Sequence, residues 1–140
     1  MASVNPAGDS SLIPTEHQTE IRVRYEETDA QGHVHHSNYL NYFEVARAEM
    51  LRQSGCSYRE LEESGVVLVV VKATLEYRRG AKYDDLLTVQ VKLAKAKGAR
   101  IVHQYRIVCG EELVCSGETT VASIDREGNV QRLPKWLTKS

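Results

Sequence analysis

The chain has 140 residues and a formal net charge of -1 at pH 7. This length predicts a single domain that is large enough for a core of its own. The balanced charge lacks the basic surplus typical of proteins that bind nucleic acid, so no nucleic-acid partner is expected. No apolar run approaches the roughly 18 residues that span a bilayer, so no integral membrane segment is expected either.

The cysteines bear on the redox environment of the protein. Cys56, Cys109 and Cys115 are odd in number and match neither a disulfide framework nor a metal-ligand spacing. Buried, reduced thiols are the better interpretation, and they favour a cytoplasmic location.

The start of the chain has the composition of a mobile tail. Residues 1–17 are rich in Ser, Pro, Gly and Ala, and they lack the charged and apolar regions of a signal peptide. Residues 18–140 are then expected to form the single domain.

The first periodic segments are a strand and a long helix. Over residues 20–25 apolar and charged side chains alternate, which predicts a half-buried strand. Over residues 38–54 apolar positions recur three and four residues apart, which predicts a helix of about 25 Å with one buried face. Ser37 or Asn38 can cap the start of this helix, and Gly55 can end it.

The remainder of the chain is mainly strand-like. Residues 57–63 have the pattern of a short helix, with Ser57 as cap and Glu60 three residues on. Four later segments have a β pattern, namely residues 66–77, 87–93, 101–107 and 113–124. Short turns separate the later ones, which favours antiparallel hairpins. The sequence therefore predicts an α+β fold in which one long helix packs against an antiparallel sheet of about five strands.

The loop before the long helix is the most informative segment. It brings Asp29, Gly32 and the histidines 33, 35 and 36 together just before the helix begins. A helix N-terminus presents unpaired N–H groups and a partial positive charge. A carboxylate beside such an end suits reactions in which an oxygen anion develops, as in attack on a carbonyl. From the residues alone, Asp29 can equally be a turn residue that accepts backbone N–H groups.

Two further interpretations of the polar residues stay open at this point. His33, His35 and His36, together with His17, could hold a metal ion, although no second group of ligands has the needed spacing. Glu44 on the helix is an alternative acid to Asp29, and it can also be a solvated helix charge.

The loop and its neighbours resemble a known family. The segment from Asp29 to Tyr39 is similar to the active-site loop of the 4-hydroxybenzoyl-CoA thioesterase family, which includes the Tol-Pal-associated short-chain acyl-CoA thioesterases. The family pattern is matched at Tyr25, Asp29, Gly32, Val34, His36 and Tyr39. The likeness extends over residues 19–137. It implies the hotdog fold, in which a central helix is wrapped by an antiparallel sheet of five to six strands.

The resemblance implies an acyl-CoA thioesterase without a metal or other cofactor. Asp29 matches the catalytic carboxylate, which acts as nucleophile through a mixed anhydride or as general base on water. His36 matches the residue at the helix start whose backbone N–H polarises the thioester carbonyl. Tyr25 matches a tyrosine found near the acid. The residues expected to bind the acyl-CoA, the basic ones through its phosphates, are Gly32, Val34, Tyr39, Arg78, Arg79, Lys97 and Arg100.

The resemblance also implies a homodimer whose chains share the active site, with dimers pairing into a homotetramer. The apolar run at residues 66–71 supports a partner subunit, because a strand that is apolar on both faces is typically buried on both. The acyl group stays open between short aliphatic, aromatic and long chains.

Two other functions remain beside thioester hydrolysis. One is a hotdog hydratase or dehydratase, which pairs an Asp with a His. The other is a non-catalytic hotdog protein that binds acyl-CoA or acyl carrier protein, and the intact Asp29 argues against it.

Overall fold

The computed structural model describes residues 14–138 of the chain. The first strand, β1 (Glu16–Arg22), begins two residues before the expected start of the domain at residue 18. Most of the expected tail, residues 1–13, lies outside the described residues.

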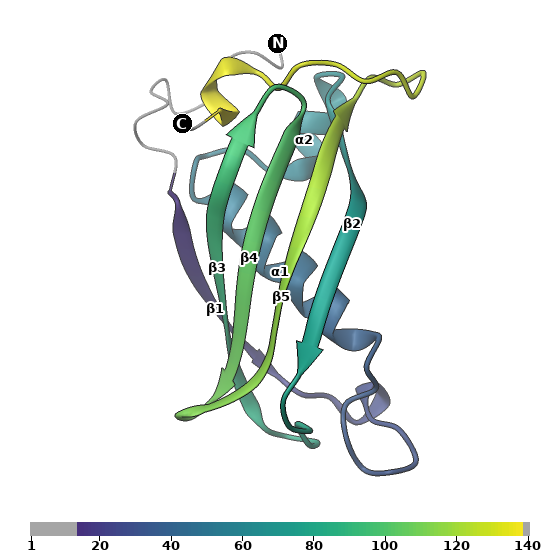
Figure 1. Ribbon diagram of the computed structural model, residues 1–140, viewed down its shortest axis with the longest axis vertical. Helices are drawn as coiled ribbons and strands as arrows, with labels where there is room; N and C mark the ends of the chain where they lie inside the picture. Colours follow the sequence, from purple (N-terminus) through teal and green to yellow (C-terminus); the bar gives the residue numbers. More distant parts are fainter. Residues whose placement is uncertain (1–13, 139–140) are drawn as a thin grey trace.

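Five strands form one antiparallel sheet in the order β1-β3-β4-β5-β2 (Figure 1). The four strands after β1 are β2 (Val67–Tyr77), β3 (Leu86–Lys97), β4 (Arg100–Cys109) and β5 (Glu112–Ile124). Tight turns join β3 to β4 and β4 to β5, as the short connections predicted. The two edges of the sheet are β1 and β2, which are separated in the chain by both helices.

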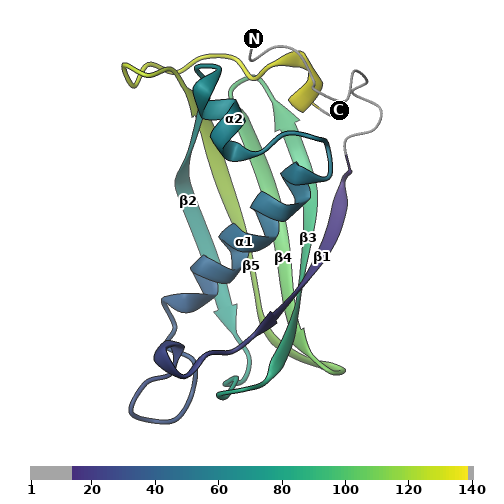
Figure 2. The same cartoon turned by 180° about the vertical axis from the view of Figure 1, so that it is seen from behind.

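The long helix α1 (Asn38–Arg52) lies across one face of the sheet, and the sheet curls around it (Figure 2). The short helix α2 (Tyr58–Glu63) follows at the far end, near the C-terminal turn η3 (Lys135–Leu137). One helix wrapped by an antiparallel sheet is the hotdog arrangement that the resemblance implied, so the α+β prediction is confirmed.

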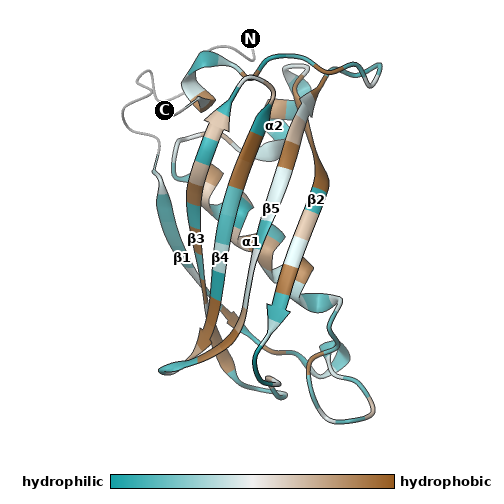
Figure 3. Cartoon of the chain, in the orientation of Figure 1, coloured by the Kyte–Doolittle hydropathy of each residue, from teal (hydrophilic) through white to brown (hydrophobic). Residues whose placement is uncertain are grey.

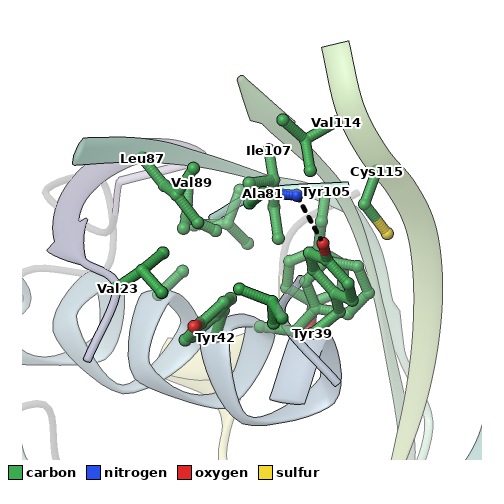
Figure 4. Packing of buried hydrophobic residues seen from close by; sticks show 14 of the residues in the cluster. Val23, Tyr39, Tyr42, Ala81, Leu87, Val89, Tyr105, Ile107, Val114 and Cys115 are labelled. Carbon is green, nitrogen blue, oxygen red and sulfur yellow. Dashed lines mark hydrogen bonds between the residues drawn. The ribbon is translucent and has the colours of Figure 1, made fainter. Parts of the chain in front are cut away.

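The apolar face of α1 fills the core against the inner face of the sheet (Figure 4). Tyr39, Tyr42, Phe43, Ala46 and Met50 are all buried, which is the set of positions that the helical periodicity predicted. The rings of Phe43 and Tyr105 are stacked with their centroids 4.0 Å apart. Gly117 of β5 leaves the space for this stack, because a Cβ there would lie 2.7 Å from Cε2 of Phe43.

The helix ends follow the sequence signals in part. Gly55 has a φ of 90° and follows the last turn of α1, as expected for a glycine that ends a helix. Ser57 and Glu60 form the expected capping box of α2. Ser37 makes no side-chain cap on α1, because its hydroxyl pairs with Nδ1 of His35 at 2.8 Å instead.

The first strand ends earlier than its alternation predicted. Pairing with β3 stops at Arg22, and residues 25–27 form the short 3-10 turn η2. The carboxylate of Glu27 accepts the N–H of Arg24 at 2.8 Å, which closes this turn and competes with a continued strand. The ring of Tyr25 is consequently exposed, at 76% of its full area, and is not half-buried.

The edge strand β2 carries apolar residues that nothing within residues 14–138 covers (Figure 3). Val70 and Val71 are 48% and 49% exposed. The apolar run at residues 66–71 is therefore not buried on both faces within one chain.

The remaining sequence expectations concern thiols and membranes. Cys56 and Cys115 are buried free thiols, and Cys109 is a half-buried free thiol. Burial raises the pKa of Cys115 to about 12, so this thiol stays protonated. Within residues 14–138, no helix is both long and apolar enough to cross a membrane.

Candidate active site

Asp29 lies in a tight turn that holds its carboxylate in place. Its Oδ1 accepts the backbone N–H groups of Gln31 at 2.9 Å and His33 at 3.3 Å. Gly32 completes the turn with a φ of 85°, a conformation that favours glycine. The other carboxylate oxygen, Oδ2, has no hydrogen-bond partner within residues 14–138, so it remains available for chemistry.

The loop around Asp29 is fastened to the start of α1. The carbonyl of Glu27 accepts the N–H of His35 at 2.8 Å and the side-chain amide of Asn38 at 2.9 Å. The hydroxyl of Tyr42 donates to the carboxylate of Glu27 at 2.9 Å. These bonds fix the position of Asp29 relative to the helix.

A surface hollow of about 350 Å³ lies beside this loop. It is lined by Asp29, Gln31, His33, Val34, His36, Tyr39, Tyr77, Arg78, Arg79 and Gly80. The loop and the first turn of α1 form one wall, and the end of β2 with the residues after it forms the other. The structure thus brings Asp29 and His36 together with four of the expected substrate-binding residues.

His36 supplies a free backbone donor at the start of the helix. Its N–H meets no acceptor within the described residues, whereas the next two N–H groups, of Ser37 and Asn38, are bonded to His35. Its ring is stacked on that of His35, with centroids 4.2 Å apart, and faces Tyr77 edge-on at 6.4 Å. The aromatic contacts hold the ring at the rim of the hollow.

The rings of two tyrosines, Tyr39 and Tyr77, line the hollow. Tyr39 is buried, and its hydroxyl accepts the N–H of Ala81 at 3.4 Å (Figure 4). Its ring lies 5.6 Å from that of Tyr77. Burial raises the pKa of Tyr39 and of Tyr77, so both phenols stay neutral at physiological pH.

The two arginines after β2 are positive groups at the hollow, and both are paired with carboxylates. Arg78 contacts Glu76 at 2.7 Å, and Arg79 contacts Glu112 at 2.6 Å. The hydrogen bond to Glu112 raises the pKa of Arg79 further. These exposed pairs contribute little to stability and can be exchanged for phosphate contacts.

Four expected site residues do not line the hollow in a single chain. Gly32 shapes the turn at Asp29 without lining the hollow, and the other three lie elsewhere. The ring of Tyr25 packs edge-on against that of Tyr83, at 5.5 Å, and does not line the cavity with Asp29. Lys97 and Arg100 flank the hairpin between β3 and β4, at the opposite end of the sheet (Figure 1). Glu44, the alternative acid, is exposed on α1 and lies outside the hollow too.

His33 and Gly80 line the hollow although the sequence indicated neither as a catalytic or substrate-binding residue. A Cβ on Gly80 would lie 2.5 Å from Cδ2 of His33, so the imidazole rests on the glycine backbone. The sequence indicated His33 only as a possible metal ligand in the loop. Nothing local could have singled out Gly80, because the contact joins residues 47 positions apart.

The histidines of the loop do not form a metal centre within the described residues. No group of three or more His, Cys, Asp or Glu side chains between residues 14 and 138 is arranged to hold a metal ion. His17 lies in β1 opposite Val91, away from the loop.

Comparison with known proteins agrees with the fold. Residues 23–140 match the model of the thioesterase-like superfamily. The acyl-CoA thioester hydrolase YbgC of Escherichia coli O6:H1 is 38% identical over 121 residues, which are 86% of this chain and 88% of the relative. The acyl-CoA thioesterase YbgC of Haemophilus influenzae is 38% identical over 106 residues, covering 75% and 78% of the two chains.

Solved structures of thioesterases also match this chain. The DHNA-CoA thioesterase from Staphylococcus aureus superposes with a TM-score of 0.81 at 31% identity, covering 84% of this chain and 80% of that one. The family match spans most of the chain, and the relatives exceed 30% identity over most of their own length. The chain therefore belongs to the thioesterase-like superfamily and is a thioester hydrolase.

Proposed function

We propose that the substrate is an acyl-CoA, which the chain hydrolyses to the free acid and CoA with Asp29 as the catalytic carboxylate. The names of the relatives from Escherichia coli and Haemophilus influenzae support the acyl-CoA substrate. The observation that carries the residue assignment is that Asp29 and His36, whose N–H is unbonded, line the same hollow.

This pairing provides the two groups that thioester hydrolysis needs. One oxygen of Asp29 is held by two backbone N–H groups, and the other is free to act on water or on the carbonyl carbon. The N–H of His36, at the positive end of α1, can donate to the oxygen anion that develops. Such a donor contributes roughly 3 kcal/mol to transition-state stabilisation in other enzymes.

Two balanced routes are compatible with this arrangement. In the first, Asp29 takes a proton from water as the water oxygen bonds to the carbonyl carbon, and collapse of the intermediate expels the CoA thiolate. In the second, Asp29 bonds to that carbon, the thiolate leaves, and water hydrolyses the resulting mixed anhydride. In both routes the leaving thiolate takes up a proton to give CoA.

The decisive experiment measures CoA release from short aliphatic, aromatic and long-chain acyl-CoA esters by the wild type and Asp29→Asn. The asparagine keeps the acceptor for the turn but carries no charge. We expect kcat to fall at least about 100-fold, which is about 3 kcal/mol, with a small change in KM. Equal activity of the two proteins on the best substrate would refute the assignment of Asp29.

The role of the His36 backbone has its own pair of variants. His36→Ala keeps the N–H and removes the ring, whereas His36→Pro removes the N–H. If the backbone donor acts in catalysis, kcat should fall about 100-fold further in the proline variant than in the alanine variant. A matched loss in both variants would assign the effect to the ring.

We propose further that two chains pair along β2 and share the site. The unpaired edge of β2, the exposed Val70 and Val71, and Tyr77 in the hollow at the strand's end support a second copy there. Pairing of dimers into a homotetramer remains an expectation. The free thiols favour the cytoplasm as the location.

The dimer is tested by light scattering coupled to size-exclusion chromatography. Val70→Lys places a charge on the β2 edge, and Gln18→Lys places the same charge on the β1 edge as a control. We expect only Val70→Lys to weaken dimerisation and to lower activity with it. An active monomer would contradict the shared site.

A further inference from the structure

Arg47 is a buried cation without a counterion in the described chain. It lies on the inner face of α1 and is 8% exposed. Its Nη1 donates to the hydroxyl of Tyr105 at 3.2 Å, and the hydroxyl of Tyr58 is its second partner. No carboxylate within residues 14–138 forms an ion pair with it, so its charge meets only neutral hydroxyls. A buried charge left in this way is strongly destabilising.

His103 of β4 is a second buried polar group with an unmet requirement. It is 4% exposed, and its Nδ1 has no hydrogen-bond partner. Its side chain lies on the same face of β4 as Tyr105, two residues on, which is the face that packs against α1. Buried ring nitrogens are normally bonded, so this one indicates a missing partner.

Arg47 and His103 line the same small cavity between α1 and the sheet. Its volume is about 40 Å³, which exceeds the 10–15 Å³ or so that one water molecule needs. The other lining residues are mostly apolar and include Met50, Leu51, Leu68, Leu93 and Ile101. The cavity can therefore hold one compact polar group, but neither an acyl chain nor a nucleotide.

We propose that this cavity binds one small monovalent anion, with a halide ion or a single carboxylate group as the fitting chemistry. The anion would neutralise Arg47, and the His103 ring, whose Nδ1 is fully buried, would have to turn to donate an N–H to it. An apolar surround strengthens such an ion contact, because the local dielectric is low. The site is separate from the hollow at Asp29, and its test does not depend on activity.

The first measurement locates the ion. Crystals of the full chain grown without halide are soaked in sodium bromide, and the anomalous signal of bromide is mapped. We expect a bromide peak in the cavity within about 3.5 Å of the Arg47 guanidinium. Water alone in the cavity, or a protein carboxylate seated against Arg47, would overturn the proposal.

The second measurement tests the energetic link in solution. Thermal unfolding is followed in bromide, in formate and in gluconate at equal ionic strength, gluconate being too large for the cavity. We expect bromide or formate to raise the unfolding temperature by about 3 °C over gluconate. A rise in bromide alone identifies a halide site, and a rise in formate as well identifies a general small-anion site.

Variants then assign the effect to the cavity. Arg47→Met preserves volume without charge, and His103→Leu removes the ring nitrogens, so both should lose the anion-dependent rise. Arg100→Met removes an exposed arginine that does not line the cavity and should keep it. An undiminished rise in Arg47→Met and His103→Leu would refute the site. If Arg47→Met does not fold, the bromide map and His103→Leu still decide.

Discussion

Asp29 and Asp125 lie in two turns of the same build. In each, Oδ1 accepts the N–H of the residue two positions on, at 2.9 Å in both turns, and of the residue four positions on. In each turn, the residue three positions after the aspartate is a glycine, Gly32 or Gly128, with a φ of 85° or 89°. Backbone turn chemistry alone therefore explains an aspartate at both positions. What distinguishes Asp29 is its place in the hollow beside α1.

Comparing variants of Asp29 and Asp125 distinguishes the effect of Asp29 on stability from its effect on catalysis. Asp29→Ala and Asp125→Ala each remove two hydrogen bonds from an exposed or half-buried turn, so the two should lower the free energy of unfolding to a similar, small extent. Only Asp29→Ala should also abolish thioester hydrolysis. Urea unfolding and CoA release, measured on the same preparations, check both statements.

Asp125→Asn is the matched control for Asp29→Asn. It makes the same chemical change in the same turn, but outside the hollow, so its kcat should equal that of the wild type. If both asparagine variants lost activity alike, the loss would come from turn geometry and not from a catalytic charge.

The contact between His33 and Gly80 yields a prediction about the wall of the hollow. Gly80→Ala would push the imidazole off its position, since the new Cβ would lie 2.5 Å from Cδ2 of His33. The N–H of His33 also bonds Asp29, so the shift should lower kcat/KM about tenfold, or about 1.4 kcal/mol. Steady-state kinetics on the best acyl-CoA ester measures the change.

A double-mutant cycle provides the control for this contact. In a His33→Ala background no ring is present to clash, so adding Gly80→Ala should change kcat/KM by less than about twofold. The same tenfold loss in both backgrounds would mean that Gly80 acts independently of His33.

The sequence predicted the parts of this fold that depend on local pattern. The apolar period of α1, the capping box at Ser57 and the turn at Gly55 are all decided within a few residues, and the structure confirms them. Tyr25 was misplaced in a strand, because the bond from Arg24 to the Glu27 carboxylate ended the strand early. Alternation of side chains carries no information about such a competing turn.

The site residues also fall into two groups, those that a local motif indicates and those that only the fold brings to the hollow. Asp29, Gly32 and His36 belong to one continuous loop, so a motif could indicate them together. Lys97 and Arg100 were grouped with the site by charge alone, and the hairpin puts them at the other end of the sheet. Gly80 and Tyr77 reach the hollow only through the path of β2 across the sheet, which no local pattern specifies.

Gly117 provides a test of core packing that is independent of function. A Cβ there would lie 2.5 Å from the carbonyl oxygen of Thr74 and 2.7 Å from the ring of Phe43. Gly117→Ala should therefore lower the free energy of unfolding by about 2 kcal/mol through overpacking. Ser116→Ala, one position earlier in β5, should stay within about 0.5 kcal/mol in the same urea titration. A smaller penalty in a Phe43→Leu background would assign part of the strain to the ring.

His103 predicts how stability depends on pH. Burial, with Arg47 close by, lowers its pKa to about 3, whereas the unfolded chain has the ordinary value of about 6.5. The folded state holds the ring neutral, so protonation of the ring favours the unfolded chain. The share of the free energy of unfolding that depends on this neutral ring is therefore complete above pH 6.5 and is lost as the pH falls toward 3. Between pH 7 and pH 5 the wild type should therefore lose about 2 kcal/mol more than His103→Leu, which cannot titrate. Urea unfolding in gluconate buffer measures the difference, because an anion beside Arg47 would raise the pKa of His103. Parallel losses in the two proteins would show that this ring does not titrate on unfolding.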